Sequence, residues 1–342
     1  MKKRKINSIN LFNNKKYIFI VFHLKYIMSY DIIGDIAIIK KPLKYDEEEY
    51  VKRILEKHKF IKTILLQETD VLPPYRIPEY KILYGKNKTE TTNIEYGLRF
   101  WVDVLKCYYS PRLSNERYRI AKQVKENEEV LVMFSGVNVY PIYIAKYSKA
   151  KIIYSIELNP FAVKYGLENL RINNINNVIT LLGDVKDISK YIDYLENGDA
   201  IIKNDLEYIK DIVDSGLEIN NLYIYEYDEI IKNIKYKKLR YVNELENLEK
   251  FNKKFDRIIM PLPKESHTFL EYTIPLIKDN GIIHLYQFFE EEKIKEGVID
   301  LLEKYSNELN FKYEILNILK VGDIAPGNYR VCIDFKVIKN KI

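Results

Sequence analysis

The sequence predicts an α/β protein whose larger part is a doubly wound sheet, with a smaller α+β domain ahead of it. Three observations predict the sheet. An apolar run at 130–134 ends in the small-residue turn Ser135-Gly136. An amphipathic helix and a second apolar run at 152–156 follow this turn, and the acid Glu157 closes that run. This order is typical of the strand–helix–strand unit that opens a nucleotide-handling sheet.

Composition bounds the class of protein. The 342 residues, 47% of them hydrophobic, are enough for one large core and a smaller domain. The formal charge of +6, from 55 basic and 49 acidic residues, is compatible with an anionic partner but does not identify one. Cys107 and Cys332 lie far apart and the four histidines are scattered, so the sequence predicts no metal site and a reducing compartment.

The first 28 residues resemble a secretion signal only superficially. A basic run, MKKRK, precedes the apolar stretch YIFIVFHLKYI, but His23 and Lys25 interrupt this stretch and no small-residue cleavage site follows. The stretch is also too short to span a membrane. We therefore expect residues 1–28 to be a loose extension of a cytoplasmic protein.

Residues 29–115 predict the smaller α+β domain, because short apolar runs surround one amphipathic helix. The expected elements are a strand within 31–39, a helix at 46–58, and strands at 61–66, 80–84 and 96–105. Ser114 or Asn115 is expected to cap a helix that runs to about Val124 and leads into the central strand.

Residues 116–340 predict the sheet domain. After the opening unit we expect a helix at 160–170, strands at 178–182, 256–260 and 281–289, a helix at 290–309, and a closing pair of strands at 312–319 and 329–338. A crossover with one helix needs about 15–25 residues. The longer gap before the fourth strand therefore predicts an insertion at about 190–245. Seven strands that end in an antiparallel pair are typical of the class I, Rossmann-like methyltransferase sheet.

The turns after the strands indicate a cofactor. Gly136 lets the backbone approach a ligand, and the Glu157 carboxylate can accept two hydrogen bonds from a ribose diol. Asp184, which follows the third strand, is expected to lie over an adenine, with the Val185 amide beside it. No G-x-G-x-x-G motif is present, which favours S-adenosylmethionine over a dinucleotide.

A proline-rich segment follows the fourth strand. Met260-Pro261-Leu262-Pro263-Lys264 occupies the position where amino-methylating enzymes place an Asn-Pro-Pro-aromatic motif that receives the target nitrogen. Prolines fix the backbone, so this segment predicts a rigid wall beside the transferred methyl group.

These motifs together resemble a known family. The segments that carry the resemblance are Phe100-Trp101-Val102-Asp103, Tyr108-Tyr109-Ser110-Pro111-Arg112-Leu113, Glu116-Arg117, Met133-Phe134-Ser135-Gly136, Glu157-Leu158-Asn159-Pro160, Met260-Pro261-Leu262-Pro263-Lys264 and Ala325-Pro326-Gly327-Asn328-Tyr329. In order and spacing they are similar to the archaeal and eukaryotic tRNA guanosine-37 N1-methyltransferases, in the archaeal branch that includes 4-demethylwyosine methyltransferases. The similarity covers about residues 29–340 apart from the insertion.

The resemblance implies a monomer that uses S-adenosylmethionine to methylate position 37 in the anticodon stem-loop of tRNA, with residues 29–115 facing the tRNA. It implies Glu116 as the general base and Arg76 as the residue that holds the base O6. Implied cofactor contacts are Arg117, Glu157, Leu158, Asp184, Val185, Gly136, Phe134 and Pro261, and implied substrate contacts are Arg112, Leu262 and Pro263.

Three departures from the family keep alternatives open. Val132 stands where the family has an acid, Asn138 replaces a second glycine, and Pro261 replaces an asparagine. We therefore expect the methionine end of the cofactor to be held differently. The enzyme could methylate N1 of guanosine 37, C7 of 4-demethylwyosine, or both. The first two departures also fit a non-catalytic RNA-binding protein on a decayed methyltransferase fold.

Overall fold

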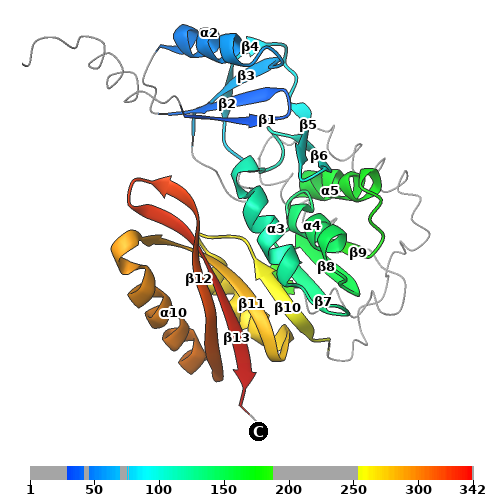
Figure 1. Cartoon of the computed structure of the whole chain (residues 1–342), viewed down its shortest axis with the longest axis vertical. Coiled ribbons are helices and arrows are strands. Elements are labelled where there is room, and N and C mark those ends of the chain that lie inside the picture. The colour runs from blue at the N-terminus through cyan, green and yellow to red at the C-terminus, as the bar shows by residue number, and fades with distance from the viewer. Residues whose placement is uncertain (1–28, 42–45, 70–74, 76, 188–252, 341–342) are drawn as a thin grey trace, which may run out of the picture. The chain divides into compact units, whose positions relative to one another are not determined.

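The computed structural model describes residues 29–41, 46–69, 75, 77–187 and 253–340, and these divide into two compact units (Figure 1). The expected extension at 1–28, the whole of the expected insertion at 190–245 and Arg76 lie outside the described residues. The first unit contains the described residues up to 69 together with Glu79–Lys88. The second unit contains the chain from Thr89 to its end.

The first unit is a four-stranded sheet with one helix. Its sheet has the order β1-β2-β3-β4, in which only β2 and β3 are parallel, and the helix α2 connects these two strands. The bounds are β1 Tyr30–Ile33, β2 Ile36–Lys40, α2 Glu47–Lys57, β3 Thr63–Gln67 and β4 Tyr80–Gly85. The strand expected within 31–39 is therefore a hairpin that turns at Gly34, whose φ of 55° is readily adopted by glycine.

The helix α2 covers one face of this sheet. It begins after Asp46, whose side chain accepts a hydrogen bond from the Glu49 backbone N–H at 2.7 Å, and three glutamates follow in its first turn. Tyr50 and Ile54 point from α2 into a core that they share with Ile64 and neighbouring sheet residues. This packing stabilises a short helix that would be marginal in isolation.

The second unit contains the predicted seven-stranded sheet. Its order is β12-β13-β11-β10-β7-β8-β9, and β13 runs antiparallel to both of its neighbours while the other pairs are parallel (Figure 1). The bounds are β7 Glu129–Met133, β8 Ile152–Glu157, β9 Val178–Leu182, β10 Phe255–Met260, β11 Ile277–Glu290, β12 Phe311–Ala325 and β13 Asn328–Lys339. This arrangement confirms the class I sheet that the sequence predicted.

The described helices of this unit are α3 Ser114–Gln123, α4 Val139–Tyr147, α5 Pro160–Ile172, α9 Leu270–Thr273 and α10 Ile294–Glu308. Short 3-10 turns lie at Pro111–Leu113, Val185–Asp187, Ser266–Phe269, Ile274–Leu276 and Glu291–Lys293. The expected cap of α3 at Ser114 or Asn115 is wrong. Because the turn Pro111–Leu113 runs directly into the helix, Leu113 takes the cap position and makes no side-chain cap bond.

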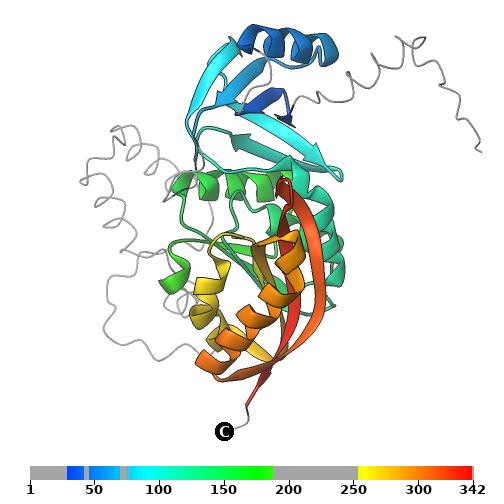
Figure 2. The ribbon, with the colours of Figure 1, turned by 90° about the vertical axis from the view of Figure 1, so that its left-hand side faces the viewer.

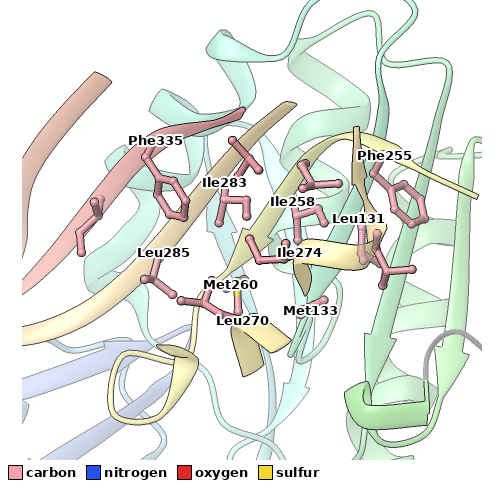
Figure 3. Close-up of a cluster of buried hydrophobic side chains, with 14 of the residues drawn as sticks. Leu131, Met133, Phe255, Ile258, Met260, Leu270, Ile274, Ile283, Leu285 and Phe335 are labelled. Carbon is pink, nitrogen blue, oxygen red and sulfur yellow. The ribbon is translucent and has the colours of Figure 1, made fainter. Parts of the chain in front are cut away.

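The two faces of the sheet differ in polarity. One face is an apolar core in which Leu131, Met133 and Leu285 pack with Leu270 of α9 (Figure 3), and the helix α10 adds Val298 and Leu302 to it. The helix α10 lies along this face of the sheet (Figure 2). Alternate residues of a strand point to opposite faces. Val132 and Tyr286 therefore point to the other face of the sheet. On that face the Tyr286 hydroxyl is hydrogen-bonded to Glu116 of α3 and to Tyr140 of α4.

The hairpin β5 Glu90–Glu95 and β6 Leu98–Asp103 belongs to the second unit, although the sequence placed it in the first domain and predicted one strand at 96–105. Its outer edge is bonded to α5. Asn169 accepts from the Trp101 N–H at 2.7 Å and donates to the Trp101 carbonyl at 3.0 Å. Asn173 does the same with Arg99, at 2.9 and 2.7 Å.

The spacing of these amides follows from helix and strand geometry. Four residues of a helix rise about 6 Å, and two residues of a strand about 6.7 Å. Two asparagines about one helical turn apart can therefore hydrogen-bond the backbone N–H and C=O groups of every second residue along one edge of a strand. This bonding explains why the first unit ends at Lys88 rather than near residue 115.

Replacing Asn169 by alanine should lower the free energy of unfolding by about 2–3 kcal/mol, because backbone groups of Trp101 are then buried without partners. The Asn169 amide also donates to the Val137 carbonyl at 3.2 Å, so this bond is lost as well. Urea denaturation measures the change. Asn177→Ala, which removes a single bond to the Ala150 carbonyl, is the control and should cost about 1 kcal/mol. Equal losses in the two variants would contradict this account of the hairpin.

Candidate functional site

The turn between β7 and α4 has an unusual backbone. Phe134, Gly136 and Asn138 all have positive φ, at 53°, 55° and 62°. The N–H groups of Ser135 and Asn138 are bonded to the Ile156 and Ser135 carbonyls, at 3.0 and 3.1 Å, which fixes this turn at the carboxyl end of the sheet, where α/β proteins bind ligands. A Cβ on Gly136 would lie 3.8 Å from the Tyr108 carbonyl oxygen, so the 107–110 segment passes beside this turn.

Glu157 is fixed at this edge by backbone donors. Its Oε2 accepts from the Gly136 N–H at 2.7 Å, and its Oε1 accepts from the Asn159 N–H at 2.9 Å. The carboxylate therefore joins the ends of β7 and β8. This is the position that the sequence assigned to a ribose-binding acid. Asn159 contributes further, because its side chain caps α5 and donates to the Lys106 carbonyl at 2.7 Å.

Asn138 adopts a left-handed conformation that glycine favours, with φ of 62°. It is fully buried, and its amide donates to the Thr180 hydroxyl at 2.8 Å. The same amide nitrogen lies 2.8 Å from where a Cβ on Gly166 would stand, so Asn138 fills space that Gly166 leaves open. Its side chain therefore packs between α5 and β9 while the backbone makes the left-handed turn.

The third strand brings Asp184 and Val185 close to Glu157. Leu182 is the register partner of Glu157, and the Gly183 N–H donates to the Glu157 carbonyl at 2.9 Å. Asp184 accepts from the Lys186 N–H at 2.9 Å, which fixes the turn that carries the buried Val185. The two predicted acids therefore follow neighbouring strands at the same edge of the sheet.

Phe134 and the proline-rich segment continue this edge. The Phe134 ring meets the Phe269 ring edge-on, at 4.9 Å between centroids. In the segment after β10, Leu262 and Pro263 are buried and Pro261 is half-buried. Ser266 fixes this turn, since its hydroxyl donates to the Met260 carbonyl at 2.7 Å and accepts from the Leu262 N–H at 3.1 Å.

Arg117 belongs to a buried cluster around Glu95 that the sequence did not predict. Its Nη1 donates to both Glu95 carboxylate oxygens, at 3.0 and 2.8 Å, and its Nη2 donates to the Ser110 carbonyl at 2.7 Å. Tyr109 and Tyr143 also donate to Glu95. The cluster connects α3 to the hairpin and to the Ser110 turn. Glu95 precedes Tyr96-Gly97 between two strands, and nothing in this local sequence indicates that it would bind a buried arginine.

Glu116 accepts three hydrogen bonds while only 6% exposed. Arg119 Nε donates to Oε2 at 2.6 Å, and Arg119 Nη2 donates to Oε1 at 2.7 Å. The hydroxyl of Tyr286 donates to Oε1 at 2.5 Å and itself accepts from the Tyr140 hydroxyl at 3.1 Å. Glu116 is thus held by its own helix and by β11. Sequence reasoning named Glu116 but missed Arg119 and Tyr286.

A charged network continues from Arg119 under α3. Asp334 accepts from Arg119 Nη1 at 2.7 Å and from His284 Nδ1 at 2.6 Å. His284 Nε2 lies 2.7 Å from Arg257 Nη1 and must accept there, because a guanidinium only donates. The ring is therefore neutral. Burial lowers the pKa of His284 below its ordinary value, despite the hydrogen bond and charge of Asp334, which raise it.

His284, Cys332 and Asp334 also form a set of potential metal ligands within 4.8 Å of one another in the described part of the chain. The ring nitrogens of His284 bond Asp334 and Arg257, and Arg119 lies against the same carboxylate. Two guanidinium groups beside the set oppose a cation, and the internal hydrogen bonds already occupy the ligand atoms. These contacts give the set a structural role as a buried hydrogen-bond network.

Other expected site residues are placed as follows. Arg112 lies in the 3-10 turn that leads into α3, and Leu158 is half-buried directly after Glu157. In the described residues, four buried side-chain polar atoms have no hydrogen-bond partner: Arg117 Nε, Ser135 Oγ, Asn138 Oδ1 and Arg330 Nε. Ser135 and Asn138 belong to the turn after β7, and Arg117 bonds the Ser110 carbonyl in the segment beside that turn. Buried polar atoms cost free energy unless a ligand pairs with them, so these three residues fit a cofactor with charged and polar groups.

None of the helices within the described ranges is long and apolar enough to cross a membrane.

Comparison with known families gives two matches. The model of the TRM5/TYW2 methyltransferase domain matches residues 91–241 and 218–316, and that of the TYW2 N-terminal domain matches residues 23–89. The boundary between the two matches agrees with the division between the two compact units.

Two curated relatives cover nearly the whole chain. The chain is 40% identical over 312 residues to the tRNA (guanine(37)-N(1))/4-demethylwyosine(37)-methyltransferase Taw22 of Nanoarchaeum equitans, covering 91% of this chain and 100% of that protein. It is 32% identical over 309 residues to the tRNA(Phe) (4-demethylwyosine(37)-C(7)) aminocarboxypropyltransferase of Methanocaldococcus jannaschii, covering 90% and 98%.

Solved structures agree with these relatives. Trm5b from Pyrococcus abyssi has a TM-score of 0.66 at 30% identity, with 98% of this chain and 82% of that chain covered. The M. jannaschii protein TYW2 in complex with AdoMet has a TM-score of 0.57 at 27% identity, with 91% and 100% covered.

Proposed function

Because the chain belongs to the TRM5/TYW2 methyltransferase family, we propose that it methylates N1 of guanosine 37 in tRNA and also C7 of 4-demethylwyosine at the same position. The observation that carries this proposal is the 40% identity, over its full length, to a relative whose name covers both methylations. The cofactor is S-adenosylmethionine, which supplies a methyl group on a positively charged sulfur.

The sheet edge supplies the groups that would hold the cofactor. Glu157 would accept from the ribose hydroxyls, and Asp184 with the Val185 N–H would bond the adenine. Gly136, Phe134, Leu158 and Pro261 would line the rest. Arg117 Nε, buried without a partner, fits the carboxylate at the methionine end. This contact would hold the methionine end of the cofactor, where Val132 offers no polar side chain.

Glu157→Gln should raise the dissociation constant of S-adenosylmethionine about 10- to 100-fold, the scale of one hydrogen bond to a charged group. An amide has one acceptor oxygen, whereas the carboxylate serves the Gly136 N–H, the Asn159 N–H and the ribose. Calorimetry measures the affinity without any turnover. Glu168→Gln, on the outer side of α5, is the matched control. An unchanged dissociation constant in Glu157→Gln would remove Glu157 from the cofactor site.

For the guanosine reaction, Glu116 would take the proton from N1. Guanine N1 is a poor nucleophile until this proton leaves, and the negative charge then spreads to O6. Arg76 would stabilise that charge, and Arg112, Leu262 and Pro263 would contact the base. The N1–C bond forms as the C–S bond breaks, so the positive charge on sulfur is lost and the proton remains on the Glu116 carboxylate.

The carbon reaction has different requirements. C7 of 4-demethylwyosine needs room and alignment with the methyl group more than a side-chain amide. Pro261 offers a half-buried ring and a backbone carbonyl but no side-chain hydrogen bond. The proposed site therefore has no side-chain amide at this position that would select a nitrogen nucleophile over a carbon nucleophile. This difference from the asparagine of the family favours the second activity.

Mass spectrometry of the modified nucleoside tests the proposal. Unmodified tRNA and tRNA that carries 4-demethylwyosine are incubated with the enzyme and S-adenosylmethionine in parallel. We expect one added methyl group on each substrate. Transfer of the heavier aminocarboxypropyl group to the second substrate would instead assign this chain the activity named for the M. jannaschii relative. Methylation of guanosine alone would overturn the dual activity.

The remaining expectations concern partners and location. We propose that the tRNA contact is at the anticodon stem-loop, that residues 29–115 take part in it, and that the enzyme is a cytoplasmic monomer. The surplus of basic residues supports tRNA binding that weakens as salt rises. Light scattering of the free protein and of its tRNA complex tests the monomer.

A further inference from the structure

Building on the role proposed for Glu116, we propose that Tyr286 and Arg119 are positioning residues that reserve one carboxylate oxygen, Oε2, for the guanine proton. In this arrangement Oε1 anchors the side chain and Oε2 does the chemistry. Neither residue touches the reacting atoms.

Lone-pair accounting distinguishes the two oxygens. A carboxylate oxygen accepts about two hydrogen bonds. Oε1 already accepts two, from Arg119 Nη2 at 2.7 Å and from the Tyr286 hydroxyl at 2.5 Å. Oε2 accepts only from Arg119 Nε, at 2.6 Å, among the described residues. One acceptor position is therefore left on Glu116, and it lies on Oε2.

Tyr286 and Arg119 are themselves held in place by further hydrogen bonds. Tyr286 is 1% exposed, and Tyr140 donates to its oxygen at 3.1 Å, so the Tyr286 proton is directed to Glu116. Burial raises the pKa of the Tyr286 hydroxyl well above its ordinary value, which keeps it a donor at neutral pH. Asp334, itself bonded to His284, holds the other side of the Arg119 guanidinium at 2.7 Å.

The arrangement fixes the geometry of the proposed base. The side chain keeps one orientation without waiting for the substrate, which lowers the entropy cost of reaching a reactive geometry. A carboxylate with free rotation would present either oxygen.

The solvent deuterium isotope effect on the rate separates positioning from mere packing, because it reports whether proton transfer limits the reaction. The titratable and charged groups around Glu116 in the described part of the chain are Arg119 on its own helix, Tyr140 on α4, Tyr286 on β11, and Cys332 with Asp334 on β13. Tyr286→Phe keeps the ring and removes only the hydroxyl. It also leaves Oε1 with one donor fewer.

In single-turnover methylation of guanosine 37, Tyr286→Phe should lower the rate about 10-fold, because Oε1 loses one of the two donors that fix the carboxylate. Proton transfer to the less well-placed carboxylate should then limit the rate, so the solvent deuterium isotope effect should rise. Calorimetric affinity for S-adenosylmethionine should stay unchanged. Tyr165→Phe, which removes a hydroxyl that bonds Glu90 on the hairpin, is the matched control and should leave both the rate and the isotope effect unchanged.

A lower rate with an unchanged solvent deuterium isotope effect would show that Tyr286 only packs, and would overturn the proposal. Arg119→Lys is a second variant, for use if Tyr286→Phe does not fold. Lysine keeps the charge but cannot bond both oxygens as a fork, so the rate should fall and the isotope effect should rise as in Tyr286→Phe. Wild-type rates in Glu116→Gln would instead show that Glu116 is not the base, which is a failure of the proposed function itself.

Discussion

Replacing Glu116 by glutamine should lower the single-turnover rate of methylation at N1 of guanosine 37 by about 100-fold or more, the usual scale for loss of a general base. The amide cannot take up the N1 proton, although it occupies nearly the same volume. Its oxygen can still accept from Tyr286, so the packing between α3 and β11 should survive. Rapid-quench kinetics with saturating S-adenosylmethionine measure the effect on the chemical step.

The control for this variant is Glu126→Gln, which removes the charge of an exposed glutamate that pairs with Lys149. It should leave the rate unchanged. Calorimetry should give Glu116→Gln a near-normal cofactor affinity, because Glu116 bonds Arg119 and Tyr286 rather than any residue proposed to hold the cofactor. The base would have to be sought elsewhere if the quench experiment returned the wild-type rate.

The largest loss of stability is expected for Asp334→Asn, at about 3–5 kcal/mol near pH 7. Asp334 is fully buried and accepts from Arg119 and His284, both of which can only donate to it. An asparagine would turn an NH2 group toward one of these donors and would leave the Arg119 charge with Glu116 alone. Urea denaturation followed by circular dichroism measures the change.

The pH dependence gives this prediction a second readout. Burial would raise the pKa of Asp334, but the hydrogen bonds from His284 and Arg119 and the charge of Arg119 outweigh it and hold that pKa well below its ordinary value. A lowered pKa stabilises the fold above the unfolded value, about 3.9, and this contribution is lost as the pH falls through the folded value. The stability gap between wild type and Asp334→Asn should therefore narrow below about pH 4. A gap that stays constant with pH would count against the charge of Asp334 as the cause.

Local patterns predicted the parts of the site that lie within one strand–turn–helix unit. The run from Val130 to Glu157 carries its own signals, namely apolar periodicity, a turn that needs left-handed backbone, and an acid at the strand end. The closing pair of strands was expected from its own apolar pattern. These strands and helices agree with the structure because neighbouring residues determine them.

Contacts between distant segments could not be predicted in this way. Glu95 bonds Arg117 across 22 positions, and Tyr286 bonds Glu116 across 170. Nothing in the sequence around Glu95 or Tyr286 distinguishes them from other strand residues. The hairpin was assigned to the wrong unit for a related reason, since Asn169 and Asn173 read locally as ordinary polar positions on a helix. The three-dimensional register alone makes them partners of β6.

The side-chain amides along β6 have a consequence for self-association. A two-stranded hairpin normally presents an unpaired edge, which can recruit a strand from another molecule and start aggregation. Here Asn169 and Asn173 occupy the backbone groups of Trp101 and Arg99 that would act as the template. The helix thus protects the strand that it positions, and it does so without adding a strand to the sheet. Loss of these amides would leave an unpaired edge of β6 that could bind a strand of another molecule, even in molecules that remain folded.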